Sequence, residues 1–185
     1  LKGHELVPNM PDVDLAVSGP LARSAEDLEL ALSIMAGPPE REALGWQLAL
    51  PRADKTNLKD FRVAIWATDE IAPVSSEIAD RAVMVGQTLS KLGATVSDTA
   101  RPNIDLMAAQ ANYQTLLNSV MTAGMSADAV IAAQKVADQF APDDYSMEAV
   151  DARSLVLSHR DWMRNNITRE QTRHAWSAFF DEWDI

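Results

Sequence analysis

Nucleophilic catalysis by this chain would require a residue other than cysteine, such as serine, because the chain contains no cysteine. That absence excludes a thiol nucleophile, a disulfide framework and a thiolate metal site. A serine hydrolase with a G-x-S-x-G motif presents its nucleophile on a sharp turn between glycines. Ser18 lies next to Gly19 but lacks the preceding glycine. The sequence therefore predicts no Ser-His-Asp site of this type.

Phosphate and metal sites are disfavoured for similar reasons. The phosphate-binding patterns G-x-x-x-x-G-K-[ST] and G-x-G-x-x-G are both absent. His4, His159 and His174 show neither i,i+4 spacing nor the H-E-x-x-H pattern that would place two imidazoles on one metal. His174 follows Glu170 by four residues, which favours a surface ion pair. We expect no metal and no cofactor.

The charge balance limits the possible partners. The chain has 16 Lys and Arg against 27 Asp and Glu, a formal net charge of -11. Such a field repels phosphate backbones and anionic lipids, so we expect no nucleic-acid and no membrane partner. Charges interrupt every apolar stretch before the ~18 residues that a membrane span requires. These features favour a cytoplasmic protein.

The elements that would position any site begin with a helix over residues 25–36. Ser24 and Asp27 form a capping pair in which the hydroxyl accepts from an amide of the first turn. Gly37 and Pro38 supply the stop. Farther along, residues 61–66 have the aromatic and β-branched content of a strand, a helix begins near residues 73–75, and a second strand covers residues 94–96. This β-α-β order predicts two parallel strands.

Beyond residue 102 the pattern is helical. Helices are expected over residues 106–124, 126–140 and 147–183, the last as one long helix or two in series. Two strands are too few for an independent open sheet, so the fold class is α/β with a sheet that is incomplete in this chain. We expect one partial domain over residues 1–185, with the loop, helix and β-α-β part in 1–100 and a mainly helical part in 101–185.

A longer motif shows a family resemblance. The run GPLARSAEDL at residues 19–28 resembles the segment G-P-[LM]-[AT]-R-[ST]-x-x-D-L of amidase signature enzymes. Residues 173–185 are similar to the family's R-x-x-W-x-x-F-F-x-x-Y-D-V, although Trp183 stands where Tyr is common. The resemblance implies the helix-rich portion of the amidase signature fold, a mixed sheet covered by helices. We interpret the motif residues as structural: Gly19, Pro20, Arg23, Ser24 and Asp27.

The resemblance implies that the parent protein is an amide hydrolase that uses a Ser nucleophile, a bridging Ser and a Lys. In the family these groups lie upstream of the G-P-L-A-R-S segment, and the chain starts on Leu1 rather than Met, so we expect a fragment without catalytic residues. None of the lysines of this chain lies in a sequence context that matches the family's catalytic lysine. The lysines are Lys2, Lys55, Lys59, Lys91 and Lys135. Ser24 is expected to cap a helix and Arg23 to fix a turn by donating hydrogen bonds.

Expected partners are a small-molecule amide substrate of the parent enzyme and the remainder of an amidase chain. Self-association is also expected, because an incomplete sheet leaves strand edges and apolar helix faces unpaired. The substrate-binding residues stay unknown at this level. The alternative interpretation is a non-catalytic, amidase-derived scaffold or protein-interaction module.

Overall fold

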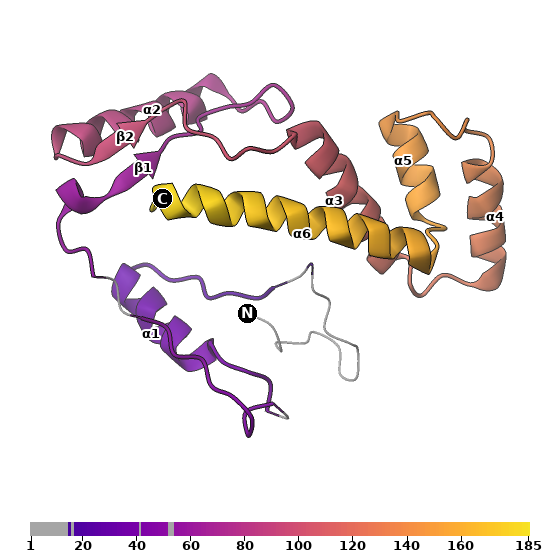
Figure 1. Cartoon of the computed structure of the whole chain (residues 1–185), viewed down its shortest axis with the longest axis horizontal. Coiled ribbons are helices and arrows are strands. Elements are labelled where there is room, and N and C mark those ends of the chain that lie inside the picture. The colour runs from indigo at the N-terminus through magenta and orange to yellow at the C-terminus, as the bar shows by residue number, and fades with distance from the viewer. Residues whose placement is uncertain (1–14, 16, 41, 52–53) are drawn as a thin grey trace. The chain divides into compact units, whose positions relative to one another are not determined.

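The structure is a computed structural model that describes residues 15, 17–40, 42–51 and 54–185 (Figure 1). The chain divides into two units, Leu1–Arg52 and Ala53–Ile185, and each is described by itself. The expectation of one partial domain over the whole chain stays a prediction.

The first unit contains helix α1, Ala25–Met35, one residue shorter than predicted. Ser24 has the extended backbone of an N-cap, with φ -136° and ψ 158°. Its Oγ accepts a hydrogen bond of 3.1 Å from the amide of Asp27. Ala36 returns to extended backbone and ends the helix. The predicted cap and first residue of this helix are confirmed, and the helix ends one residue earlier than predicted.

Replacing Ser24 with alanine is expected to destabilise α1 by about 1 kcal/mol, because the Asp27 amide loses its acceptor at the positive end of the helix. The matched control is Ser33→Ala on the same helix, where the hydroxyl only donates back to the carbonyl of Leu30. That control should be neutral or slightly stabilising. Thermal unfolding followed by circular dichroism compares the two, and equal melting curves would contradict the capping role.

The second unit opens with the predicted β-α-β segment. A 3-10 turn at Leu58–Asp60 leads into strand β1, Arg62–Ala64, then helix α2, Ser76–Lys91, and strand β2, Thr95–Ser97. The strands are parallel, with Val63 in register with Val96. Gly93 turns the chain between α2 and β2 with a φ of +100°, a left-handed conformation that glycine tolerates.

Strand β1 is paired along both edges. On the edge away from β2, the amide of Ala64 donates to the carbonyl of Ile185 at 2.8 Å, and the carbonyl of Arg62 accepts from the amide of Asp184 at 2.9 Å. The amide of Ile185 also donates to the Arg62 carbonyl at 3.4 Å, so Ile185 bonds to residues 62 and 64 on either side of Val63, as in a parallel pair. Residues 184 and 185 therefore run beside β1.

The remaining helices are α3, Leu106–Met121, α4, Ala127–Ala137, α5, Met147–Ser154, and α6, His159–Glu182. The region 147–183 is thus two helices in series. Ser158 starts the second by accepting from the amide of Asp161 at 3.1 Å. Helix α3 packs on α5 and α6, and α4 packs on α5. Figure 1 shows α6 running from the α4 and α5 end back to β1.

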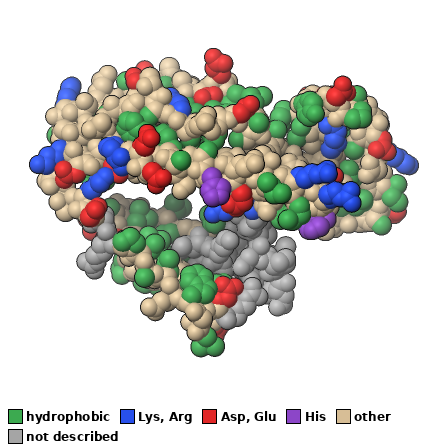
Figure 2. All heavy atoms as spheres, viewed as in Figure 1, with side chains coloured by type: hydrophobic (Ala, Val, Ile, Leu, Met, Phe, Trp, Pro, Cys, Tyr) green, Lys and Arg blue, Asp and Glu red, His purple; other side chains and the backbone are tan. Residues whose placement is uncertain are grey.

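The core of the described residues is small. Val63 and Leu116 are its large apolar members, and the other buried apolar residues are alanines: Ala94, Ala133, Ala137, Ala149 and Ala152. Many large apolar side chains are exposed, including Ile78, Val85 and Leu92 along α2 and at its end. Hydrophobic groups consequently lie among the charged ones on the surface (Figure 2). The α/β class is confirmed, and the sheet is small, parallel and open.

Candidate functional site

The family-like motif does not assemble a catalytic group within the part of the chain that the structure describes. Gly19 is exposed, and a Cβ placed there would meet nothing within 4 Å. Pro20 is half-buried, and Asp27 is exposed in the first turn of α1. The Ser24 hydroxyl accepts from the Asp27 amide, and no Lys or His hydrogen-bonds to it among the described residues. Activation of a serine nucleophile requires such a base.

The role of Arg23 as a turn-fixing donor stays a prediction. Its side chain is exposed, and no hydrogen bond from it to the described residues is present. Among the described residues, the turn before α1 is held by the Ser24 cap and by the bond from the Leu28 amide to the Ser24 carbonyl.

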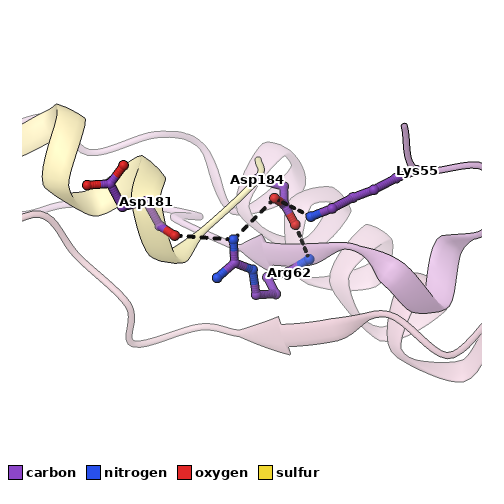
Figure 3. A network of polar contacts seen from close by, with 4 residues as sticks. All are labelled: Lys55, Arg62, Asp181 and Asp184. Atoms are coloured by element: carbon purple, nitrogen blue, oxygen red, sulfur yellow. Dashed lines mark hydrogen bonds and ion pairs between the residues drawn. The ribbon is translucent and has the colours of Figure 1, made fainter. Parts of the chain in front are cut away.

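The most connected ionic cluster lies at the outer edge of β1 and joins Lys55, Arg62 and Asp184 (Figure 3). Lys55 Nζ lies 2.5 Å from Asp184 Oδ1, and Arg62 Nη2 lies 3.3 Å from the same oxygen. The other carboxylate oxygen accepts from the Arg62 amide at 2.8 Å. Arg62 also donates to the carbonyl of Asp181 at 3.3 Å. The cluster thus fastens the end of α6 and the residues after it to β1.

The hydrogen bond from Lys55 is the main reason that the pKa of Asp184 lies well below its ordinary value, followed by bonds from the amide and guanidinium of Arg62. A carboxylate held ionised with both oxygens occupied is a poor general acid or base. The side chain of Asp184 is only 19% exposed. We therefore interpret the cluster as a structural clamp.

The clamp makes stability depend on pH. The pKa of Asp184 is lower in the folded state than in the unfolded state, where it is near 4. The ionised Asp184 therefore stabilises the folded state fully above about pH 4, and this stabilisation is lost as the pH falls further. Asp184→Asn is expected to lower stability at pH 7 and to flatten the acid side of the profile. Lys55→Met should act in the same direction, because it removes the largest cause of the shift. Urea unfolding between pH 3 and 7 measures both, and profiles parallel to wild type would contradict the clamp.

A second polar cluster joins α3 to α5. Ser154 is fully buried, and its Oγ accepts from Nδ2 of Asn118 at 2.8 Å. The same hydroxyl donates to the carbonyl of Asp151 at 2.6 Å. Gln114 donates to the Asn118 side chain at 3.0 Å. A serine bonded to an amide and a carbonyl has no base to take its proton, so this buried serine is a packing element.

Aromatic residues near the end of α6 contact one another. The ring of Trp176 lies 5.7 Å from those of Phe179 and Phe180, and 6.4 Å from that of Trp66. The guanidinium of Arg101 lies 4.6 Å from the Trp66 ring, within the range of a cation–π interaction. Phe180 keeps 52% of its surface exposed, so the cluster is only partly buried.

Sequence reasoning missed both polar clusters. Lys55 and Asp184 lie far apart in the chain, and no local pattern joins them. The α3 cluster does carry a local signal, because Gln114 and Asn118 lie at i,i+4 spacing on this helix. The described residues contain no group of three or more His, Asp or Glu placed to hold a metal ion. None of the described helices is long and apolar enough to cross a membrane.

Comparison with known proteins identifies the family. The sequence profile of the Amidase family matches residues 10–185. The chain belongs to this family, which confirms the resemblance seen in residues 19–28.

Individual relatives match more locally. The A subunit of glutamyl-tRNA(Gln) amidotransferase from Pseudomonas aeruginosa is 35% identical over 89 residues, covering 46% of this chain and 18% of the relative. The protein of that name from Saccharolobus solfataricus is 38% identical over 91 residues, or 47% and 18% of the two chains. Indoleacetamide hydrolase of Bradyrhizobium diazoefficiens is 22% identical over 171 residues, covering 92% of this chain and 31% of the relative.

The matched part is a minor portion of each of these relatives. The chain spans less than a third of the length of those compared above. No solved structure matches the chain.

Proposed function

We propose that this chain is a non-catalytic portion of an amide hydrolase that cleaves carboxylic amides through an acyl-enzyme on serine. The observation that carries the proposal is the membership in the Amidase family together with the state of Ser24, whose hydroxyl caps α1. The nucleophile, the bridging serine and the lysine base are then not among these 185 residues.

The lysines support this assignment. Lys55 is engaged with the Asp184 carboxylate, whereas a hydroxyl relay to serine needs a lysine that faces the nucleophile. Lys59, Lys91 and Lys135 are exposed, and Lys2 lies outside the described residues. The substrate is proposed to be a small-molecule amide, the remainder of an amidase chain to be the main partner, and the location to be cytoplasmic.

The 185-residue chain is expected to show no turnover of simple aryl or aliphatic amides, because it lacks an activated nucleophile and an oxyanion site. The assay measures ammonia or amine release against a heat-treated sample of the same chain. Turnover abolished by one Ser or Lys substitution would overturn the proposal. Trace activity that survives every such substitution would instead identify a contaminating enzyme.

The second candidate is an amidase-derived scaffold or interaction module, and the exposed apolar side chains favour it. Leu30 and Ile34 of α1 are 61% and 76% exposed, and Met121 of α3 is 75% exposed. The reading frame upstream of Leu1 separates the two candidates. A Gly/Ser-rich segment within about twenty to fifty residues, with a Lys farther back, would support the enzyme. Its absence would support the module.

A further inference from the structure

The outer edge of strand β2 carries unpaired backbone groups. The amide of Thr95 donates to the carbonyl of Phe61 at 3.0 Å, and the carbonyl of Ser97 accepts from Ile65 at 2.8 Å, so both residues face β1. Val96 alternates with them and turns its own N–H and C=O away from β1. Within the described residues, β2 pairs with β1 and with no other strand. This edge can accept a further strand.

An open groove runs beside this edge, between β2 and α2. Its volume is about 460 Å³. Helix α2 lines it with Val83, Gln87 and Ser90, and β2 lines it with Val96. The side chain of Val96 points toward α2, because its Cγ1 lies 3.5 Å from a Cβ built on Gly86. A side chain on the same face of an added strand would enter the groove.

The two ends of the groove carry opposite charges. Lys91 is the last residue of α2, and Asp98 follows the last residue of β2. Both line the groove, both are exposed, and neither forms an ion pair within the described part of the chain. Because α2 and β2 run in opposite directions in a β-α-β unit, the positive charge lies where β2 begins and the negative charge where it ends.

We propose that a second copy of this chain pairs its own β2 with this edge, antiparallel and about a two-fold axis at Val96. In this two-fold arrangement, the end of β2 that carries Asp98 in one copy lies beside the start of β2 in the other copy, where Lys91 of that copy lies. The symmetry forms this Asp98–Lys91 pair twice. A two-fold interface must be self-complementary, and this groove meets that condition in charge and in its unpaired backbone groups.

Helix spacing supports the same arrangement. Gly86 approaches side chains from both Ile65 and Val96, so α2 lies over the pair of strands. Joining two such units edge to edge separates the two α2 helices by two strand spacings, about 9.6 Å. Packed helices lie about 8–10 Å apart. Val83 of one helix would then face Ser90 of the other helix without a gap.

Disulfide trapping tests the axis directly, because the chain has no cysteine of its own. Opposed residues of a hydrogen-bonded antiparallel pair have Cα atoms about 5.5 Å apart, within the range that a disulfide spans. Val96→Cys is expected to give a covalent dimer under mild oxidation. Thr95→Cys is the matched control, since its two copies lie diagonally across the axis and too far apart. Equal crosslinking of both variants, or none at position 96, overturns the proposal.

Charge reversal provides an independent readout by sedimentation equilibrium. Asp98→Lys and Lys91→Asp are each expected to weaken dimerisation about tenfold, because two attractions become repulsions. The double variant should restore the wild-type constant. Asp80→Lys and Lys135→Asp are controls for net charge at exposed positions. A monomeric wild type, or assembly that Asp98→Lys leaves unchanged, overturns the proposal, and the latter result would assign association to the other exposed apolar faces.

Discussion

Replacing Leu116 with alanine is expected to lower the free energy of unfolding by about 2–5 kcal/mol. Leu116 on α3 is 1% exposed and is one of only two large apolar side chains that the described residues bury. Helix α3 packs on α5, whose buried apolar residues are the alanines Ala149 and Ala152, and such small side chains cannot fill the space that removal of Leu116 leaves. The cavity term is therefore expected to add to the lost burial.

The control for this substitution is Met121→Ala on the same helix. Met121 is 75% exposed, so its truncation removes little buried surface and should change stability by less than about 0.5 kcal/mol. Chemical denaturation at fixed protein concentration measures both variants. Similar losses at the two positions would mean that α3 is not the centre of the packed region.

Replacing Gly86 with valine should have the second largest effect. A Cβ at this position would lie 2.8 Å from Cγ1 of Ile65, a distance that real structures do not tolerate. Ile65 is β-branched and rotates little, so α2 would have to move away from the strands. Overpacking of this kind costs about 1–3 kcal/mol.

Shortening Ile65 tests whether the loss of stability in Gly86→Val comes from the contact with Ile65. The double variant Gly86→Val with Ile65→Ala is expected to recover part of the loss, because the clashing atom is removed. Gly124→Val is the matched control, since a Cβ at Gly124 meets nothing within 4 Å. Thermal unfolding of the wild type, the single variants Gly86→Val and Ile65→Ala, their double variant and Gly124→Val provides the comparison. A double variant less stable than both of its single variants would contradict the steric explanation.

Local signals explain which elements the sequence predicted well. Ser24 and Asp27 satisfy a cap within one turn, so the start of α1 follows from neighbouring residues alone. Ser158 and Asp161 carry the same spacing at the start of α6, and reading that pair as a cap would have resolved the region 147–183 into two helices. Strand β1 is shorter than the predicted 61–66, and strand β2 is shifted by one residue from the predicted 94–96, because strand limits depend on paired partners, which β-propensity does not encode.

Contacts between distant residues could not be predicted in this way. The clamp around Asp184 depends on Lys55 and Arg62, and the buried Ser154 depends on Asn118 of another helix. Such pairs form only when the packing of whole elements brings them together. The candidate site shows the same limit, because the family motif specified a helix cap at Ser24, which is a local feature, and no contact with a distant residue.

The two neighbours of β1 differ in how far the chain must travel to reach it. Val63 meets Val96 across a single helix, whereas the Arg62 amide bonds to Asp184 across 122 positions. The entropy of closing a loop grows with its length, and contacts at long sequence separation slow folding. The β-α-β segment can therefore form early, while residues 184 and 185 reach β1 only after α3 to α6 have folded and shortened the path. The clamp around Asp184 thus belongs to the last stage of folding, and its loss should accelerate unfolding more than it slows folding.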